Sequence, residues 1–118
     1  MTIPKEKLIR DMFAAIDRRE FDTLNEFFTA DICYERPGYE PLHGLSELEH
    51  FYRHVRIIRD GRHEIEYVVL RSDAAACWGR FVGESHAGTE LEERFADVYV
   101  LRDGRIARRT THFFRPAI

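Results

Sequence analysis

The chain has 118 residues, the length of one ordinary domain, and its 44% hydrophobic content can supply a core without disulfides or metals to hold it. Its 18 Lys and Arg against 21 Asp and Glu give a net charge of -3, so it lacks the basic surface that nucleic acid requires. The N-terminus has no signal-peptide pattern, and no apolar run reaches membrane-spanning length. We therefore expect one domain over residues 1–118, located in the cytoplasm, with Cys33 and Cys77 as reduced thiols and no membrane partner.

Apolar residues at helical spacing predict three helices in the first half of the chain. The first covers residues 4–18, and a short second one follows over residues 21–28. Ser46 and Glu49 form the S-x-x-E pattern of a capping box, which predicts that a third helix begins there.

Near residue 62 the pattern changes from helical spacing to strand alternation. After a brief strand over residues 32–36, we expect four strands, at residues 63–71, 75–85, 90–102 and 105–114. The connections between these four are short, which favours an antiparallel meander. Gly79 and Gly83 offer places where a long strand can bend. The predicted fold is α+β, a curved and mainly antiparallel sheet with helices across its concave face and a pocket between the two.

Asp97 is the residue that fits a core least well. In the strand at residues 90–102 it shares a face with Phe95 and Tyr99, and a carboxylate in apolar surroundings is costly unless it is paired or protonated. A paired Asp97 would be structural, whereas a protonated one would be a candidate acid. Both interpretations stay open at this point.

Several arginines and aromatic residues share strand faces that would line the pocket if they pointed inward. Alternation alone does not determine which face is the inner one. The candidate pocket residues are Tyr34, Arg36, Trp78, Arg80, Tyr99, Arg109, Thr111 and Phe113.

Two segments carry a resemblance to a known superfamily. Residues 28–37 (FTADICYERP) with Gly44 and residues 51–53, and residues 96–106 (ADVYVLRDGRI), resemble the nuclear transport factor two-like (NTF2-like) superfamily. Within it the chain is similar to ketosteroid isomerases and SnoaL-like polyketide cyclases. The resemblance implies a cone-shaped fold with an open-ended pocket, a homodimer formed through the outer sheet face, and inward positions for Tyr34, Arg36, Asp97, Tyr99, Arg109, Thr111 and Phe113.

The resemblance transfers only part of the catalytic machinery. Asp97 falls where the isomerases keep a hydrogen-bonding acid and the cyclases an acid/base Asp. The isomerase base falls at Arg36, which cannot accept a proton, and its oxyanion-hole tyrosine falls at Met12. Steroid-type isomerisation is therefore disfavoured. Epoxide-hydrolase chemistry of the limonene type needs a second Asp on the last strand, and we find no match.

The favoured hypothesis is an enzyme without cofactor or metal, a cyclase or isomerase that acts on a small apolar carbonyl compound with Asp97 as acid/base. One alternative is a non-catalytic ligand-binding protein in which Arg36, Arg80 or Arg109 neutralises Asp97. The other is a dimeric interaction module whose pocket is filled by protein side chains. The outer face that would form the homodimer is expected to carry Cys77, Phe81, Thr110 and His112.

Overall fold

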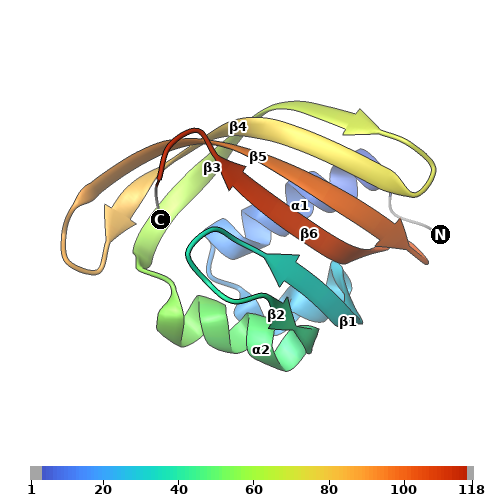
Figure 1. Cartoon of the computed structure of the whole chain (residues 1–118), viewed down its shortest axis with the longest axis horizontal. Coiled ribbons are helices and arrows are strands. Elements are labelled where there is room, and N and C mark those ends of the chain that lie inside the picture. The colour runs from blue at the N-terminus through green and yellow to red at the C-terminus, as the bar shows by residue number, and fades with distance from the viewer. Residues whose placement is uncertain (1–3, 117–118) are drawn as a thin grey trace.

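The computed structural model describes residues 4–116 (Figure 1). No helix in that range is both long and apolar enough to cross a membrane. The elements in chain order are α1 (Lys5–Asp17), the 3-10 helix η1 (Phe21–Glu26), β1 (Phe28–Glu35), β2 (Leu42–His43), α2 (Gly44–His50), the π-helical turn η2 (Phe51–Val55), β3 (Ile58–Leu70), β4 (Ala74–Ser85), β5 (Glu90–Arg102) and β6 (Arg105–Phe113).

The strands form one sheet in the order β2-β1-β6-β5-β4-β3. All neighbouring strands are antiparallel except β1 and β6, which are parallel. Figure 1 shows the sheet curving around α1, which crosses its concave side, while α2 lies beside β1 and β2. The predicted α+β fold, with helices on a curved and mainly antiparallel sheet, is confirmed.

The core lies between the helices and the concave face. The apolar stripe of α1 faces it, η1 and η2 add aromatic side chains, and α2 adds Leu48. Its largest fully buried apolar side chains include Leu8, Ile9, Met12, Phe13, Ile16, Phe28, Ile32, Tyr34, Leu48, Phe51 and Ile106.

Several element boundaries differ from the prediction. The second helix, expected over residues 21–28, is a 3-10 helix that ends at Glu26, and the first strand begins at Phe28 rather than at residue 32. The third helix begins at Gly44 rather than Ser46, because the Glu47 carboxylate accepts the backbone N–H of His43 at 2.9 Å and no side chain caps from Ser46. The short strand β2 was not predicted, since two residues show no alternation. Strand β3 begins at Ile58, earlier than expected, because charged residues on this edge strand mask its pattern.

The orientation predicted for β4 is wrong. Cys77 and Phe81, expected on the outer face, are 0% and 2% exposed and point into the core. Trp78 and Arg80, expected in the pocket, point outward. Cys77 and Phe81 supply the apolar side chains that this strand turns toward the core, whereas Arg80 pairs with acidic side chains in the solvent. Thr110 lies on the outer face as predicted.

Candidate functional site

Asp97 lies in the middle of β5 with 0% of its surface exposed. Strand register places it opposite Cys77 on β4 and Thr111 on β6. Oδ2 accepts hydrogen bonds from Arg109 Nε at 2.8 Å and from the Tyr99 hydroxyl at 2.8 Å. Oδ1 accepts one from the Thr111 hydroxyl at 2.6 Å. This is the geometry of a buried ion pair whose carboxylate is satisfied by further donors.

A chain of hydrogen bonds leads from Asp97 across the core. A carboxylate can only accept hydrogen bonds, so the Thr111 hydroxyl donates its single proton to Asp97. The Tyr34 hydroxyl, 2.8 Å from the Thr111 oxygen, must therefore be the donor of the contact between them. Arg36 Nη1 in turn donates to the Tyr34 oxygen at 3.1 Å. Burial raises the pKa of Tyr34, but the guanidinium groups of Arg109 and Arg36 outweigh it, so the pKa is lowered. The tyrosine is thus a comparatively acidic donor within the network.

Arg109 is the cation at the centre of this site. Its Nη1 donates to the Tyr52 hydroxyl at 2.8 Å, and its guanidinium lies 4.6 Å from the ring centroid of Tyr34 and 5.2 Å from that of Phe13. Burial works to lower the pKa of Arg109, but the charge of Asp97 and the neighbouring tyrosines together outweigh it and hold this pKa well above its usual value. Arg109 therefore stays charged.

Cys77 completes the network on its far side. Its sulfur lies 3.3 Å from the Tyr99 hydroxyl, which already donates to Asp97, so the thiol is the donor of this contact. Burial, helped by the charge of Asp97, raises the pKa of Cys77 to about 11. A thiol that remains protonated is a poor nucleophile, so Cys77 has a structural role here.

A small cavity of about 10 Å³ adjoins the network. This volume holds about one water molecule, so a larger ligand enters only if side chains move. Asp97 is not among the lining residues, because Arg109 and Thr111 lie between it and the cavity. Aromatic walls come from Phe81, Phe95 and Phe113. The polar lining consists of Arg36, Tyr52, Arg56, His63, Arg109 and Thr111.

His63 faces this cavity from β3 and is held by the last residue of α1. The Asp17 carboxylate accepts the backbone N–H of His63 at 2.8 Å and lies 2.6 Å from its Nδ1. The ring packs against Phe13, Phe81 and Phe95 at centroid distances of 4.6, 4.9 and 5.4 Å. Burial lowers the pKa of His63 in spite of Asp17, so the imidazole is neutral. Since Nδ1–H donates to Asp17, Nε2 is the unprotonated nitrogen.

The structure brings most of the predicted pocket residues together around Asp97. They are Tyr34, Arg36, Tyr99, Arg109 and Thr111, with the half-buried Phe113 at the cavity wall.

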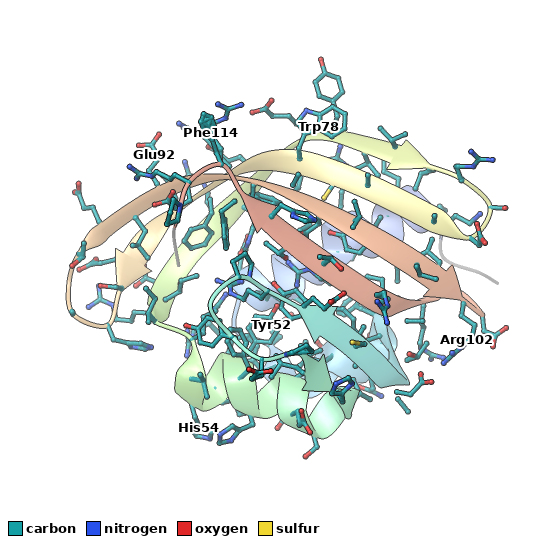
Figure 2. The ribbon with its side chains drawn as sticks, viewed as in Figure 1. Tyr52, His54, Trp78, Glu92, Arg102 and Phe114 are labelled. Carbon is teal, nitrogen blue, oxygen red and sulfur yellow. The ribbon has the colours of Figure 1, made fainter. Side chains whose placement is uncertain are left out.

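Trp78 and Arg80 do not join this group. Figure 2 shows Trp78 projecting from the convex side of the sheet, whereas Tyr52 lies between α2 and the concave side. Arg80 forms ion pairs at the surface with Glu64 at 2.9 Å and Glu92 at 2.6 Å. The prediction that these two side chains line the enclosed pocket is wrong.

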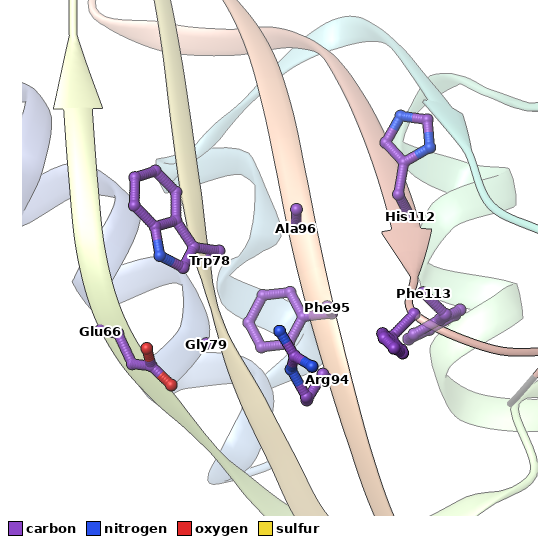
Figure 3. A pocket seen from close by; sticks show the side chains of 9 residues that line it. Glu66, Trp78, Gly79, Arg94, Phe95, Ala96, His112 and Phe113 are labelled. Atoms are coloured by element: carbon purple, nitrogen blue, oxygen red, sulfur yellow. The ribbon is translucent and has the colours of Figure 1, made fainter.

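Trp78 instead borders a shallow depression of about 310 Å³ on the outer face. Figure 3 shows Trp78, Ala96 and His112 side by side across neighbouring strands, with Glu66 and Arg94 at one end. The depression is separated from Asp97 by the sheet itself.

Three polar cavity residues were not predicted. Tyr52 lies in the segment 51–53 that carries the resemblance but was assigned no place in the pocket, and Arg56 had no pattern to mark it. His63 stood at the expected start of a strand, yet its partner Asp17 lies 46 residues earlier. A contact between residues so far apart in the sequence cannot be predicted from the local spacing of apolar residues.

Comparisons with known proteins agree with this architecture. A family model described as a SnoaL-like domain matches residues 9–109. A search of curated proteins gave no match.

Solved structures share the fold at low sequence identity. An NTF2-like protein of unknown function from Burkholderia pseudomallei superposes with a TM-score of 0.83 at 20% identity, over 92% of this chain and 88% of that one. A putative SnoaL-like polyketide cyclase from a Jannaschia species gives 0.80 at 12% identity, over 92% and 83%. An epoxide hydrolase like limonene epoxide hydrolase, from M. tuberculosis, gives 0.78 at 17% identity, over 91% and 80%.

Proposed function

Because the chain belongs to the SnoaL-like domain family, we propose that it is a cofactor-independent enzyme of the cyclase or isomerase kind that acts on a small carbonyl compound. The observation that carries the proposal is a pair of donors at the cavity, Arg109, which the buried Asp97 holds in place, and the Tyr52 hydroxyl, which accepts from Arg109 and so keeps its own proton to donate. Donors fixed in a dry site stabilise the negative charge that develops on a carbonyl oxygen.

The cavity also contains a base. His63 is neutral, Asp17 fixes its tautomer, and its ring lines the cavity. In the proposed reaction Nε2 takes a proton from the carbon next to the carbonyl, and the electron pair of that C–H bond moves to the carbonyl oxygen. Arg109 and Tyr52 stabilise the resulting enolate. In a β,γ-unsaturated compound, return of the proton from Nε2 to the γ-carbon completes an isomerisation. In a compound with a second carbonyl, the enolate carbon attacks that carbonyl carbon, and Nε2 returns its proton to the new alkoxide to complete a cyclisation.

In this scheme Asp97 is a positioning residue that acts through Arg109. The hypothesis that Asp97 is itself the acid/base group requires a proton relay through the Thr111 hydroxyl, because Asp97 does not line the cavity. The two roles predict different effects of substitution, described below.

Deuterium exchange tests the proposal without knowledge of the product. The protein is incubated in D₂O with a panel of small ketones and ketoacids, and loss of their α-proton signals is followed by NMR. Catalysed exchange is expected for at least one compound, and His63→Gln should slow it by about 10²–10⁴-fold. His86→Gln, a change at an exposed position, is the control and should retain the full rate.

The outcome for Asp97→Asn separates the two roles. As a positioning residue, Asp97 leaves measurable exchange in the variant, and His63→Gln has the larger effect. If exchange survives His63→Gln and disappears in folded Asp97→Asn, Asp97 is the acid/base. A wild-type protein that exchanges no compound of the panel would contradict the enzymatic proposal.

One observation favours a second candidate, a non-catalytic ligand-binding protein. Asp97 is paired with Arg109 at 2.8 Å and separated from a cavity of about 10 Å³, as expected if the network is purely structural. This candidate predicts ligand-dependent stabilisation without exchange.

We also propose a homodimer formed through the outer sheet face. Cross-strand neighbours Val69, Ala76, Val98 and Thr110 form a row without charge on that face. Val69 and Val98 are 51% and 46% exposed, and a second copy of the chain would cover them. A cytoplasmic location stays a prediction.

A further inference from the structure

Arg56 is a buried cation beside the cavity. It is 6% exposed, and its Nε has no hydrogen-bond partner. No hydrogen bond or ion pair joins its side chain to another residue within 4–116. Burial lowers the pKa of Arg56 to about 10, which still leaves it charged at neutral pH. Arginine is rarely buried in this way without an anion.

The protein holds this guanidinium in place without neutralising it. Arg56 lies 4.9 Å from the ring centroid of Tyr52 and 5.9 Å from that of Phe21, contacts that offset part of the desolvation cost. Its backbone N–H donates to the Phe51 carbonyl at 2.9 Å, and the carbonyl of the next residue, Ile57, accepts from His86 at 2.9 Å. The chain on both sides of Arg56 is thus fixed where η2 leads into β3.

The charges around the cavity do not balance at Arg56. Asp97 is the carboxylate of the central network, and it is already paired with Arg109 at 2.8 Å. Asp17 is bound to His63, and Glu93, a buried carboxylate opposite Phe81, is bound to Arg115. None of these carboxylates compensates Arg56, so a negative charge supplied by a ligand would meet an unpaired guanidinium already facing the cavity.

We infer that the cavity binds a small compound that carries a carboxylate, with the carboxylate on Arg56 and the rest of the molecule among the aromatic walls. Guanidinium and carboxylate match in shape and can form two parallel hydrogen bonds. Tyr52 and Arg109 then lie within the same lining for a carbonyl oxygen elsewhere in the ligand. The inference deepens the proposed function, since it makes the substrate a carbonyl acid rather than a neutral apolar compound.

Entry of such a compound requires the cavity to widen. Phe113 is half-buried at its wall and lies near the C-terminal end of the sheet, where β6 stops. Phe113 forms none of the hydrogen bonds to Asp97, so its displacement would widen the cavity and leave those bonds in place.

A matched pair of ligands tests the inference. Benzoate and benzamide have nearly the same shape but differ in charge, and inorganic phosphate controls for a purely electrostatic effect. At constant ionic strength, benzoate should raise the melting temperature in a saturable way, because a ligand that binds only the folded state stabilises it. Benzamide and phosphate should have little effect.

Arg56→Met supplies the matched variant, with Arg62→Met on the exposed part of β3 as control. Arg56→Met should lose the response to benzoate, and its melting temperature without ligand should equal or exceed that of the wild type, since an uncompensated buried charge is removed. Arg62→Met should keep the response. If Arg56→Met does not fold, Arg56→Lys serves instead, and it should bind benzoate more weakly because it lacks the planar fork.

The Nε–H signal of Arg56 in an NMR titration with benzoate gives the direct readout, and it should shift with the same saturation curve. The inference is overturned if benzamide stabilises as well as benzoate, if phosphate alone stabilises, if Arg56→Met or Arg56→Lys keeps the full benzoate response, or if the Nε–H signal does not move. Benzoate has no exchangeable α-proton, so this result is independent of deuterium exchange. Benzoate binding without deuterium exchange of any ketone or ketoacid would contradict the proposed enzymatic activity but would still support the carboxylate site.

Discussion

Asp97 is closed off from solvent, and its carboxylate accepts hydrogen bonds from three side chains instead. Asp97→Asn leaves the buried charge of Arg109 without its anion and should cost roughly 3–5 kcal/mol of unfolding free energy. Asp60→Asn is the control, because Asp60 pairs with Arg59 at the surface with 61% of its side chain exposed. Surface pairs contribute about 1 kcal/mol or less. Urea unfolding compares the two variants, and equal losses would show that the Asp97 pair adds no stability.

Alternation along β5 predicted that Asp97 shares a face with Phe95 and Tyr99, and the resemblance to the NTF2-like superfamily implied that this face points inward. The partner of Asp97 could not be predicted, since Arg36, Arg80 and Arg109 were all candidates. Strand register decides between them: β6 brings Arg109 beside Tyr99, and β4 turns Arg80 to the solvent.

His63 should make stability depend on pH. Its pKa is lowered in the folded state by burial, against opposing contributions from Asp17. Below the usual value of 6.5 the unfolded chain therefore binds more protons than the folded one, and stability should fall as the pH falls from 6.5.

His63→Gln should flatten this part of the profile, measured as melting temperature between pH 7.5 and 5, because it removes the group that resists protonation. His86→Gln, at an exposed position, is the control and should keep the wild-type profile. Wild-type and His63→Gln profiles that stay parallel would contradict the buried, neutral imidazole.

At the level of elements, Gly79 fixes the approach of β4 to β3. A Cβ there would lie 1.9 Å from the backbone oxygen of Glu64, close to a break in register between the two strands. Gly79→Ala must push backbone apart and should cost at least about 3 kcal/mol.

Gly38→Ala is the matched control for that substitution. Gly38 has a φ of +87° and nothing within 4 Å of an added Cβ, so only backbone strain applies, about 1–2 kcal/mol. Denaturant midpoints compare the two variants. If Gly79→Ala is the milder change, the close packing of β3 on β4 is not essential to the curved sheet.

The elements with long regular patterns were predictable, and the short or charged ones were not. Helix α1 and strands β4 and β5 carry clear periods that match their boundaries closely. The face of β4 was nevertheless assigned wrongly, because Trp78 suggested a core position. A large aromatic residue is equally suited to an apolar outer face that a partner covers.

At the scale of the whole molecule, the proposed homodimer can be followed through the only tryptophan of the chain. Trp78 is 40% exposed on the outer face, so its emission should shift to longer wavelength when dilution separates the subunits. Val98→Lys should give a monomer in sedimentation experiments, since it places a charge in the centre of the apolar row.

Val55→Lys is the control for the dimer experiment, because Val55 is 42% exposed in η2, away from the sheet face. It should leave the assembly unchanged. A wild-type protein that sediments as a monomer at tens of micromolar would contradict the dimer.

The overall architecture followed from the change of period near residue 62 and from the resemblance to the NTF2-like superfamily. The size of the cavity could not be predicted, because it depends on how Arg56, Phe113 and Tyr52 pack together from different elements. The same holds for the contact between Asp17 and His63, which joins the end of α1 to β3.

The state of the His63 ring tests the central claim most directly, because the proposed chemistry requires a base in the cavity. Long-range ¹H–¹⁵N correlation spectra of the wild-type protein at pH 7 distinguish the two neutral tautomers and the imidazolium. We expect a neutral ring with the proton on Nδ1, bound to Asp17, and an unprotonated Nε2. A protonated Nε2, as the other tautomer or as the imidazolium, would contradict it.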